Sequence, residues 1–452
     1  MCKLHQKYAV TLVILSALGC SDDNDDASQL VSAASIEPRP IPGCENESYL
    51  ACNVESAGCQ KAIFSTMACL RGNQGAVMPA ARTISRDEFG VELTADKLEP
   101  TLSSEQLSAL EHGLVLMKLL DIGDLTGTGF VDSQKETVPA FYDADTDVVT
   151  FVRQDFGALA DNGAANLTLA HEYVHALQDQ EHDLNRLIDE YGATLDSSLA
   201  FQSVVEGEAS VHEDTFLSAV WGMDERDLNR EARYAQQEKL FKENITGYSP
   251  VLAIRRSFPY YVGGMFVYRA FASGGMAQVR KLYAAPPTST LEIRTGTSAI
   301  PVVADPPAPP SGYELLSVDT LGSELFLDFV EASLPNGAEV AAFRNEWRGD
   351  RAYLYYKPGA ADVAVLWRIK LPGEAQRTQL RSAFPNSRVQ DEDVLIVLTT
   401  DADSTAIGTI LFDNVTNGNV VSPSTAQDDL VQAARRVLRP RLSPLDRSRT
   451  RR

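Results

Sequence analysis

One predicted helix constrains this fold more than any other segment of the chain. It begins near Asn166, ends before Gly192, and contains the sequence LAHEYVHALQDQ at residues 169–180. Apolar residues recur in it every three or four positions, as on one face of a packed α-helix, at Leu167, Ala170, Val174, Leu177, Leu184 and Ile188. A neighbouring polar stripe has the same spacing and consists of His171, His175, Gln178 and His182. We therefore expect the helix to be buried on one side and to present histidines beside that side.

His171 and His175 are spaced so that both can bind one metal ion. Residues four apart on a helix share a face, with Cβ atoms roughly 5–6 Å apart. Glu172 follows the first histidine, and a carboxylate there can hold a metal-bound water and take its proton. Zinc lowers the pKa of such a water to about 7. The pattern predicts a catalytic zinc site; a helix with two polar surface histidines is the alternative.

A zinc site needs a third protein ligand. The metzincin pattern would place a glycine at 178 and a histidine at 181, where this chain has Gln178 and Glu181. A second predicted helix, from about Leu199 to Trp221, contains VVEGEA at residues 204–209. Its two acids, Glu206 and Glu208, stand in an apolar run, where a carboxylate needs a partner. They lie about 200° apart on a helix, so only one can face the metal, and the residues alone leave both as candidates.

These two motifs together resemble the gluzincin zinc metallopeptidases. The closer resemblance is to uncharacterised bacterial lipoprotein peptidases that carry an HExxHALQDQ helix and a later EGxA. It extends over roughly residues 70–400, because shorter segments also match that pattern, at Ala140–Asp143, Phe258–Gly264, 286–290 and Trp347–Arg351. The resemblance implies a zincin-like fold, Zn²⁺ as the metal, and a peptide or protein as the substrate.

The resemblance also implies roles for single residues of the metal site. Glu206, the glutamate before the glycine, would be the third ligand in preference to Glu208. Glu172 would be the general base. Gln178 and Asp179 would orient a zinc-bound histidine through its other ring nitrogen.

Two further roles concern the substrate. The strand near Val148–Val152 precedes the histidine helix, and in gluzincins such an edge strand pairs with an extended peptide. On this resemblance Tyr260, Tyr261 or His212 would stabilise the oxyanion; the alternatives are aromatic packing for the two tyrosines and a surface position for the histidine.

The N-terminus has the features of an export signal. Lys3 and Lys7 precede the apolar stretch Ala9–Leu18, which is too short to span a bilayer comfortably. The next residues complete ALGC at 17–20, which resembles a bacterial lipobox. This resemblance implies a lipid on Cys20 and an anchor in the cell envelope, at the outer membrane or its periplasmic face. A plain secreted protein, cut nearby, is the alternative.

Four cysteines follow within a short segment, at Cys44, Cys52, Cys59 and Cys69. An even, clustered set in an exported chain predicts two disulfides, for which three pairings are possible. If segments 45–52 and 60–70 are helical, with a turn at 57–58, the nested pairing 44–69 and 52–59 would staple that hairpin. A four-cysteine zinc site is the alternative, although the usual C-x2-C spacing is absent.

The expected fold class is α+β. A mainly helical zincin-like domain with a small edge sheet would be followed by a smaller α+β unit, with strands at 353–356, 363–368 and 394–399 and a helix at 373–384. The expected organisation is a signal peptide at 1–20, a polar tether at 21–43, a disulfide-stapled helical hairpin at 44–75, the zincin-like metallopeptidase domain at 76–303, the α+β unit at 313–420, and an Arg-rich, disordered tail at 421–452.

Charge argues against one class of partner. The net charge is −22, and the tail from Arg435 onward contributes +7, so the body carries −22 − 7 = −29. A general affinity for nucleic acid is therefore not expected.

We thus expect an exported, lipid-anchored zinc metallopeptidase. The alternatives are a catalytically inactive zinc-containing lipoprotein that acts as a binding or scaffold module, and a zinc hydrolase of a cell-wall amide bond.

Overall fold

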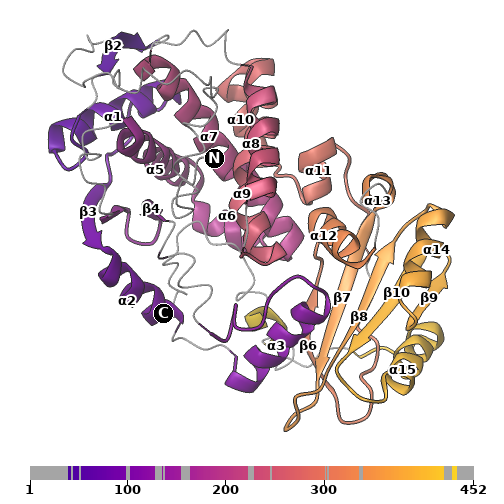
Figure 1. The fold of residues 1–452 in the computed structure, drawn as a ribbon. Helices are drawn as coiled ribbons and strands as arrows, with labels where there is room; N and C mark the ends of the chain where they lie inside the picture. Colours follow the sequence, from indigo (N-terminus) through magenta and orange to yellow (C-terminus); the bar gives the residue numbers. More distant parts are fainter. Residues whose placement is uncertain are drawn as a thin grey trace, which may run out of the picture.

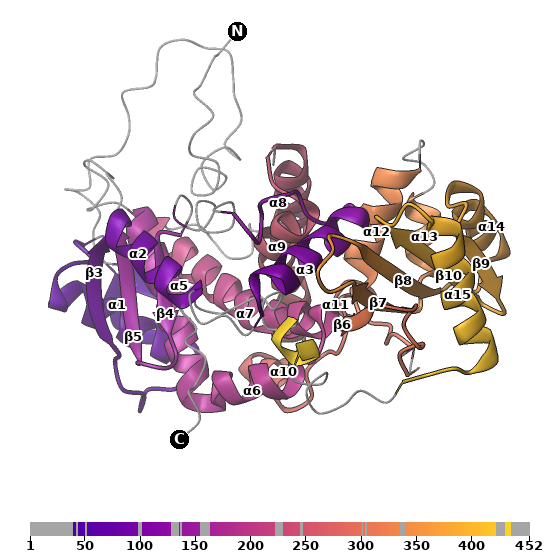
Figure 2. The same cartoon turned by 90° about the horizontal axis from the view of Figure 1, so that it is seen from below.

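The computed structural model describes residues 39–41, 44–49, 52–97, 102–127, 135, 138–153, 163–221, 229–244, 247–300, 302, 305–334, 340–421 and 430–434. The expected signal peptide, Cys20, and most of the tether and of the Arg-rich tail lie outside these residues. The described part combines helices with sheets, which confirms the α+β class at this coarse level. Two of the sheets lie at opposite ends of the molecule, with long helices between them (Figure 2).

Long helices form the centre of the molecule (Figure 1). They are α5 (Gly163–His182), α7 (Leu195–Trp221), α8 (Arg230–Asn244) and α9 (Pro250–Gly274). The shorter α6 (Leu184–Tyr191) connects α5 to α7, and the short helices α10 (Met276–Ala284) and α11 (Thr290–Thr295) follow α9. The apolar stripe of α5 is buried as expected, with Ala170, Val174 and Leu177 fully enclosed. This burial leaves the adjacent histidine stripe facing α7.

The prediction of one continuous helix from Asn166 to before Gly192 is wrong in one respect. The structure has two helices there, with a break at Asp183. This residue has a positive φ of 56°, which an aspartate tolerates better than most residues. Its side chain then accepts a hydrogen bond from the backbone N–H of Arg186 and caps the new helix α6. The histidine-bearing helix therefore ends at His182.

Helices α7 and α9 pack very closely, and glycines permit the contact. A Cβ atom built on Gly207 would lie 2.5 Å from the backbone oxygen of Gly263. A Cβ atom on Gly263 would lie 2.4 Å from the backbone oxygen of Ser203. The glycine between Glu206 and Glu208 thus has a packing role, since any side chain there would push α9 away.

A three-stranded sheet lies beside α5. Its order is β3 (Ala80–Ser85), β5 (Val148–Arg153) and β4 (Ala140–Asp143), with β3 parallel and β4 antiparallel to β5. The interpretation of β5 as an edge strand is therefore wrong, because both of its sides are occupied and β4 is an outer strand. Helix α2 (Arg86–Lys97) follows β3 directly, and Ser85 and Glu88 form a capping box at its start.

The cysteine segment has the nested pairing. Disulfides join Cys44 to Cys69 and Cys52 to Cys59. The expected helix at 45–52 is wrong, because Cys44–Tyr49 forms β2 and pairs with β1 (Arg39–Ile41). The second helix is present as α1 (Ala57–Leu70), so residues 57–58 begin a helix instead of forming a turn. Apolar residues of α1 share a core with α5, and the ring of Phe64 packs edge-on against Tyr173.

The second half of the chain forms a five-stranded antiparallel sheet. Its order is β6 (Glu314–Asp319), β7 (Gly349–Tyr356), β8 (Val363–Lys370), β10 (Asp393–Thr399) and β9 (Ser387–Gln390). One face packs against α15 (Ser404–Asn417), and the other packs against α12 (Ser323–Ser333) and α3 (Ser104–Leu116). The expected strands β7, β8 and β10 and helix α14 (Glu374–Ala383) are present, with α13 (Val340–Glu346) before β7.

Asp196, at the start of α7, links the helical half to the sheet half. Its Oδ1 accepts hydrogen bonds from the backbone N–H and the hydroxyl of Thr290, at 2.8 and 2.6 Å. Its own backbone N–H donates to the oxygen of Thr320, which follows β6. One continuous hydrophobic core also extends from α7 and α9 to the sheet, so the two halves stabilise each other.

Within the described residues, no helix combines the length and the apolar character needed to cross a membrane.

The glycine contact between α7 and α9 predicts the effect of one added methyl group. Gly207→Ala should lower the free energy of unfolding by about 1–3 kcal/mol, because the helices must separate to admit the Cβ atom. Gly58→Ala is the matched control, since a Cβ atom there meets nothing within 4 Å and the residue lies in a helix. It should be neutral or stabilising by up to about 1 kcal/mol. Urea unfolding of both variants checks this, and equal midpoints would contradict it.

Asp196 predicts a pH dependence of stability. Burial, with a contribution from Asp350, raises its pKa to about 7 from 3.8, although the hydrogen bonds from Thr290 oppose this. As pH rises from about 4 to 7, the unfolded chain releases this proton while the native protein keeps it, so stability falls by up to about 4 kcal/mol. Asp196→Asn should remove that part of the slope. Thermal unfolding between pH 4 and 8 measures it, and identical slopes would contradict the assignment.

Candidate metal centre

Helices α5 and α7 bring His171, His175 and Glu206 together. One possible ligand atom from each lies within 4.8 Å of the others, and no other such group of three occurs in the part of the chain that the structure describes. The Nε2 atoms of the two histidines lie 3.1 and 3.3 Å from the same carboxylate oxygen of Glu206. Two imidazole nitrogens and one carboxylate oxygen are donors that zinc accepts, and three protein ligands leave a fourth position open. The three residues could therefore hold a metal ion, and their donor atoms suit zinc.

The charges at this centre are buried and balance one another. His171, His175 and Glu206 are 8%, 5% and 3% exposed. Burial acts to raise the pKa of Glu206, but His175 and His171 outweigh it and lower that pKa to about 2. Burial acts to lower the pKa of His171, but hydrogen bonds with Glu206 and Glu213 raise it well above its usual value. Glu206 thus keeps a negative charge that can bind a cation.

Glu172 lies in the same buried region, as its place after His171 predicted. Burial raises the pKa of its carboxyl group, and the nearby histidines His175 and His171 partly oppose this. The backbone N–H of Tyr142, in β4, donates a hydrogen bond to the carboxylate. A carboxylate with a raised pKa, held beside the two histidines, is suited to accept and return a proton.

Gln178 orients His175, whereas Asp179 has another role. The Oε1 atom of Gln178 lies 2.9 Å from Nδ1 of His175, one turn along α5. Asp179 instead accepts hydrogen bonds from the hydroxyl of Tyr142 and from the backbone N–H of Leu184. It therefore ties α5 to β4 and to the start of α6.

Glu213 was not among the predicted site residues, but it contacts the centre. Its Oε2 lies 3.1 Å from Nδ1 of His171. A carboxylate on that nitrogen directs the other nitrogen, Nε2, toward the metal position. The sequence contained a signal for it, since Glu213 follows Glu206 by seven residues, which is two helical turns on the same face of α7.

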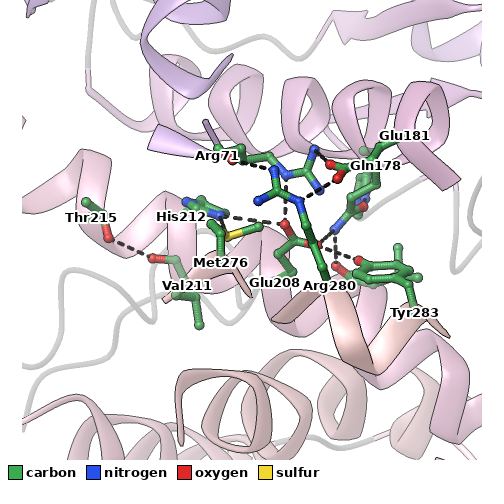
Figure 3. Close-up of polar contacts among 12 residues, drawn as sticks. Arg71, Gln178, Glu181, Glu208, Val211, His212, Thr215, Met276, Arg280 and Tyr283 are labelled. Atoms are coloured by element: carbon green, nitrogen blue, oxygen red, sulfur yellow. Dashed lines mark hydrogen bonds and ion pairs between the residues drawn. The ribbon is translucent and has the colours of Figure 1, made fainter. Parts of the chain in front are cut away.

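Glu208 is not part of the metal-binding group and belongs to a second buried cluster, which Figure 3 shows. It is fully buried and accepts hydrogen bonds from Arg71, Gln178 and Tyr283. Burial acts to raise its pKa, but Arg71 and His212 outweigh this and hold the pKa well below its usual range. Of the two glutamates left open by the sequence, the structure therefore brings Glu206 to the histidines.

The three candidates for an oxyanion donor lie in different surroundings. Tyr260, on α9, hydrogen-bonds to Glu206, and its ring centroid lies 6.0 Å from that of His171. The ring of Tyr261 instead packs near Phe241. His212 is buried beside Glu208 and Met276. Among these three, Tyr260 is the one in contact with the metal centre.

Comparisons of the chain with protein-family models, curated proteins and solved structures found no match.

The contact of Glu213 with His171 predicts a loss of metal affinity. Glu213→Ala should weaken zinc binding by about 10–100-fold, because His171 then loses the partner that orients its ring. Competition with a chromogenic chelator measures the affinity. Glu190→Ala is the control, because Glu190 is an exposed residue of α6 that pairs with Arg186. Equal affinities in the two variants would contradict the role of Glu213.

Proposed function

We propose that this protein is an exported zinc metallopeptidase of gluzincin type. The observation that carries the proposal is the buried group of His171, His175 and Glu206, with Glu172 beside it on the same helix as the two histidines. A purely structural zinc site usually has a fourth protein ligand and has no use for a base such as Glu172. This favours hydrolysis over the inactive scaffold.

The chain's own residues supply the proton transfers of such a reaction. Zinc bound by the two histidines and Glu206 would polarise the scissile carbonyl and lower the pKa of the attacking water. Glu172 would accept the proton of that water and return it to the leaving amine, and its raised pKa suits both transfers. Burial raises the pKa of Tyr260 well above its usual value, so its phenol stays protonated and can donate to the oxyanion.

The position of β4 supports an extended peptide as the substrate. It is an outer strand of the three-stranded sheet, and its Tyr142 N–H is directed at Glu172 instead of at β5. A peptide that added to this edge would run past the proposed base. The substrate-pairing role expected of β5 is thus assigned to β4. The sheet beside α5 also supports a zincin-like fold for this half of the chain.

The disulfides support export. Two disulfides between residues 44 and 69 form and persist in an oxidising compartment. Together with the predicted export signal and the lipobox-like ALGC, they support the proposal of a cell-envelope location with a lipid on Cys20.

Two substitutions test the proposed activity. Wild-type protein should bind one zinc ion and cleave a peptide library, and removal of the metal with a chelator should abolish cleavage. Glu172→Gln should keep the zinc but lower kcat by about 10²–10⁴-fold, because the general base is lost. Glu206→Gln should lose the zinc. Zinc content by mass spectrometry and cleavage rates are the measurements, with exposed Glu190→Gln as the control.

Each result has a clear meaning. Full activity in Glu172→Gln would exclude it as the base. Full zinc content in Glu206→Gln would remove it from the ligand set. A zinc-loaded wild type that cleaves no peptide would favour the scaffold or the cell-wall amide hydrolase.

A further inference from the structure

Arg71 is a buried cation at the end of the disulfide-closed segment. It follows α1, two residues after Cys69, and its exposed fraction is 0%. Its Nε donates to Oε1 of Glu208 at 2.7 Å, and its Nη1 lies 3.4 Å from Glu181. Its backbone oxygen accepts a hydrogen bond from Arg280 at 2.9 Å (Figure 3). The guanidinium is therefore fixed between α7 and α5.

Glu208 connects Arg71 to Gln178. While Oε1 faces Arg71, Oε2 accepts hydrogen bonds from Nε2 of Gln178 at 3.1 Å and from the hydroxyl of Tyr283 at 2.5 Å. An ionised carboxylate has no hydrogen to donate. The groups that face Glu208 must therefore all be donors, and the Arg71 charge holds the carboxylate in this state.

The donors required by Glu208 determine how the amide of Gln178 is oriented, and therefore which of its atoms faces His175. Its Nε2 also donates to the backbone oxygen of Val205 at 2.9 Å. The backbone oxygen of Val205 and the carboxylate of Glu208 can only accept hydrogen bonds. The amide nitrogen of Gln178 must therefore face these two groups, and its amide oxygen must face His175. That oxygen is 2.9 Å from Nδ1 of His175, so Nδ1 carries a hydrogen, and Nε2, which faces Glu206, is the nitrogen left to bind a metal once it has released its own proton.

We propose that Arg71 is a positioning residue for the metal ligand His175 and acts through Glu208 and Gln178. The proposal rests on the metal centre of the proposed function. It adds a chain of hydrogen bonds from Arg71 through Glu208 and Gln178 to His175, called the relay below, which begins outside α5, the helix that carries His175. It makes the cysteine segment part of the support of the metal centre, since Arg71 directly follows α1 and the 44–69 disulfide holds that helix end. It also gives buried Gln178 a role that packing alone does not require.

The test measures the zinc affinity of the full disulfide-bonded chain by competition with a chromogenic chelator, with circular dichroism as the check on folding. Arg71→Met is combined with Glu208→Gln, because removing one partner alone would leave an uncompensated buried charge. Gln178→Leu is made separately and together with this pair. The double variant Arg71→Met/Glu208→Gln, called the pair variant, and the single variant Gln178→Leu should each weaken zinc affinity by about 10–100-fold. The triple variant should be no weaker than Gln178→Leu, because the pair acts through Gln178.

Several results would overturn the relay. One is a folded pair variant with wild-type zinc affinity, and another is a triple variant in which the two losses multiply. If the pair variant does not fold, Gln178→Leu decides: wild-type affinity overturns the relay and a 10–100-fold loss supports it. Peptide cleavage is not part of the readout, so the relay can hold even if the peptidase activity does not. A wild type that binds no zinc would overturn both the relay and the metal centre.

A second buried ion pair provides the control. Arg294 pairs with Glu324 at 2.6 Å and joins α11 to α12. Arg294→Met with Glu324→Gln makes the same chemical change without touching Gln178, and it should leave zinc affinity unchanged. An equal loss of affinity in this variant would show that any missing ion pair weakens the centre, which contradicts the relay.

Discussion

The arrangement of this molecule depends on two buried carboxylates that stand two residues apart on one helix. Glu206 and Glu208 are 3% and 0% exposed, and neither charge could be buried without a cation or hydrogen-bond donors. They point to different sides of α7, so each needs its own partners. The histidines of α5 face Glu206, and Arg71 at the end of α1 faces Glu208. The burial of α7 therefore requires that α5 and the cysteine segment pack in defined positions around it.

The glycine between these carboxylates adds a third element to the site. Gly207 lets α9 approach until its backbone is in van der Waals contact with α7. At that distance Tyr260 of α9 reaches Glu206. A larger residue at 207 would preserve the helix and both carboxylates, but it would move the phenol away from the metal centre. The EGEA sequence thus combines two charged groups with the small residue that the helix crossing requires.

The sequence predicted those features of the site that depend on one helix alone. The pairing of His171 with His175 follows from helical period, and so does the divergence of Glu206 from Glu208. Which glutamate faces α5 depends on the rotation of α7, which packing against α9 determines, so spacing could not decide it. The seven-residue spacing from Glu206 indicated that Glu213 shares its face of α7, but Glu213 was not predicted as a site residue. The helix breaks at Asp183 because this one residue adopts a positive φ, which the apolar pattern does not indicate. The central position of β5 depends on its pairing with β3, which is distant in the sequence, so local patterns could not predict it either.

The two carboxylates differ in the groups that balance their charge. Glu206 can therefore bind a metal ion, while Glu208 holds the side chains that support the site. The charge of Glu206 is balanced by imidazoles that must give up protons when a metal ion binds. The charge of Glu208 is balanced by Arg71, whose guanidinium stays protonated at any physiological pH. Metal binding would therefore change the protonation around Glu206, whereas Arg71 would keep its charge beside Glu208. Gln178 connects the two groups, so the ring of His175 would be held by a cluster whose charges need not change when a metal ion binds.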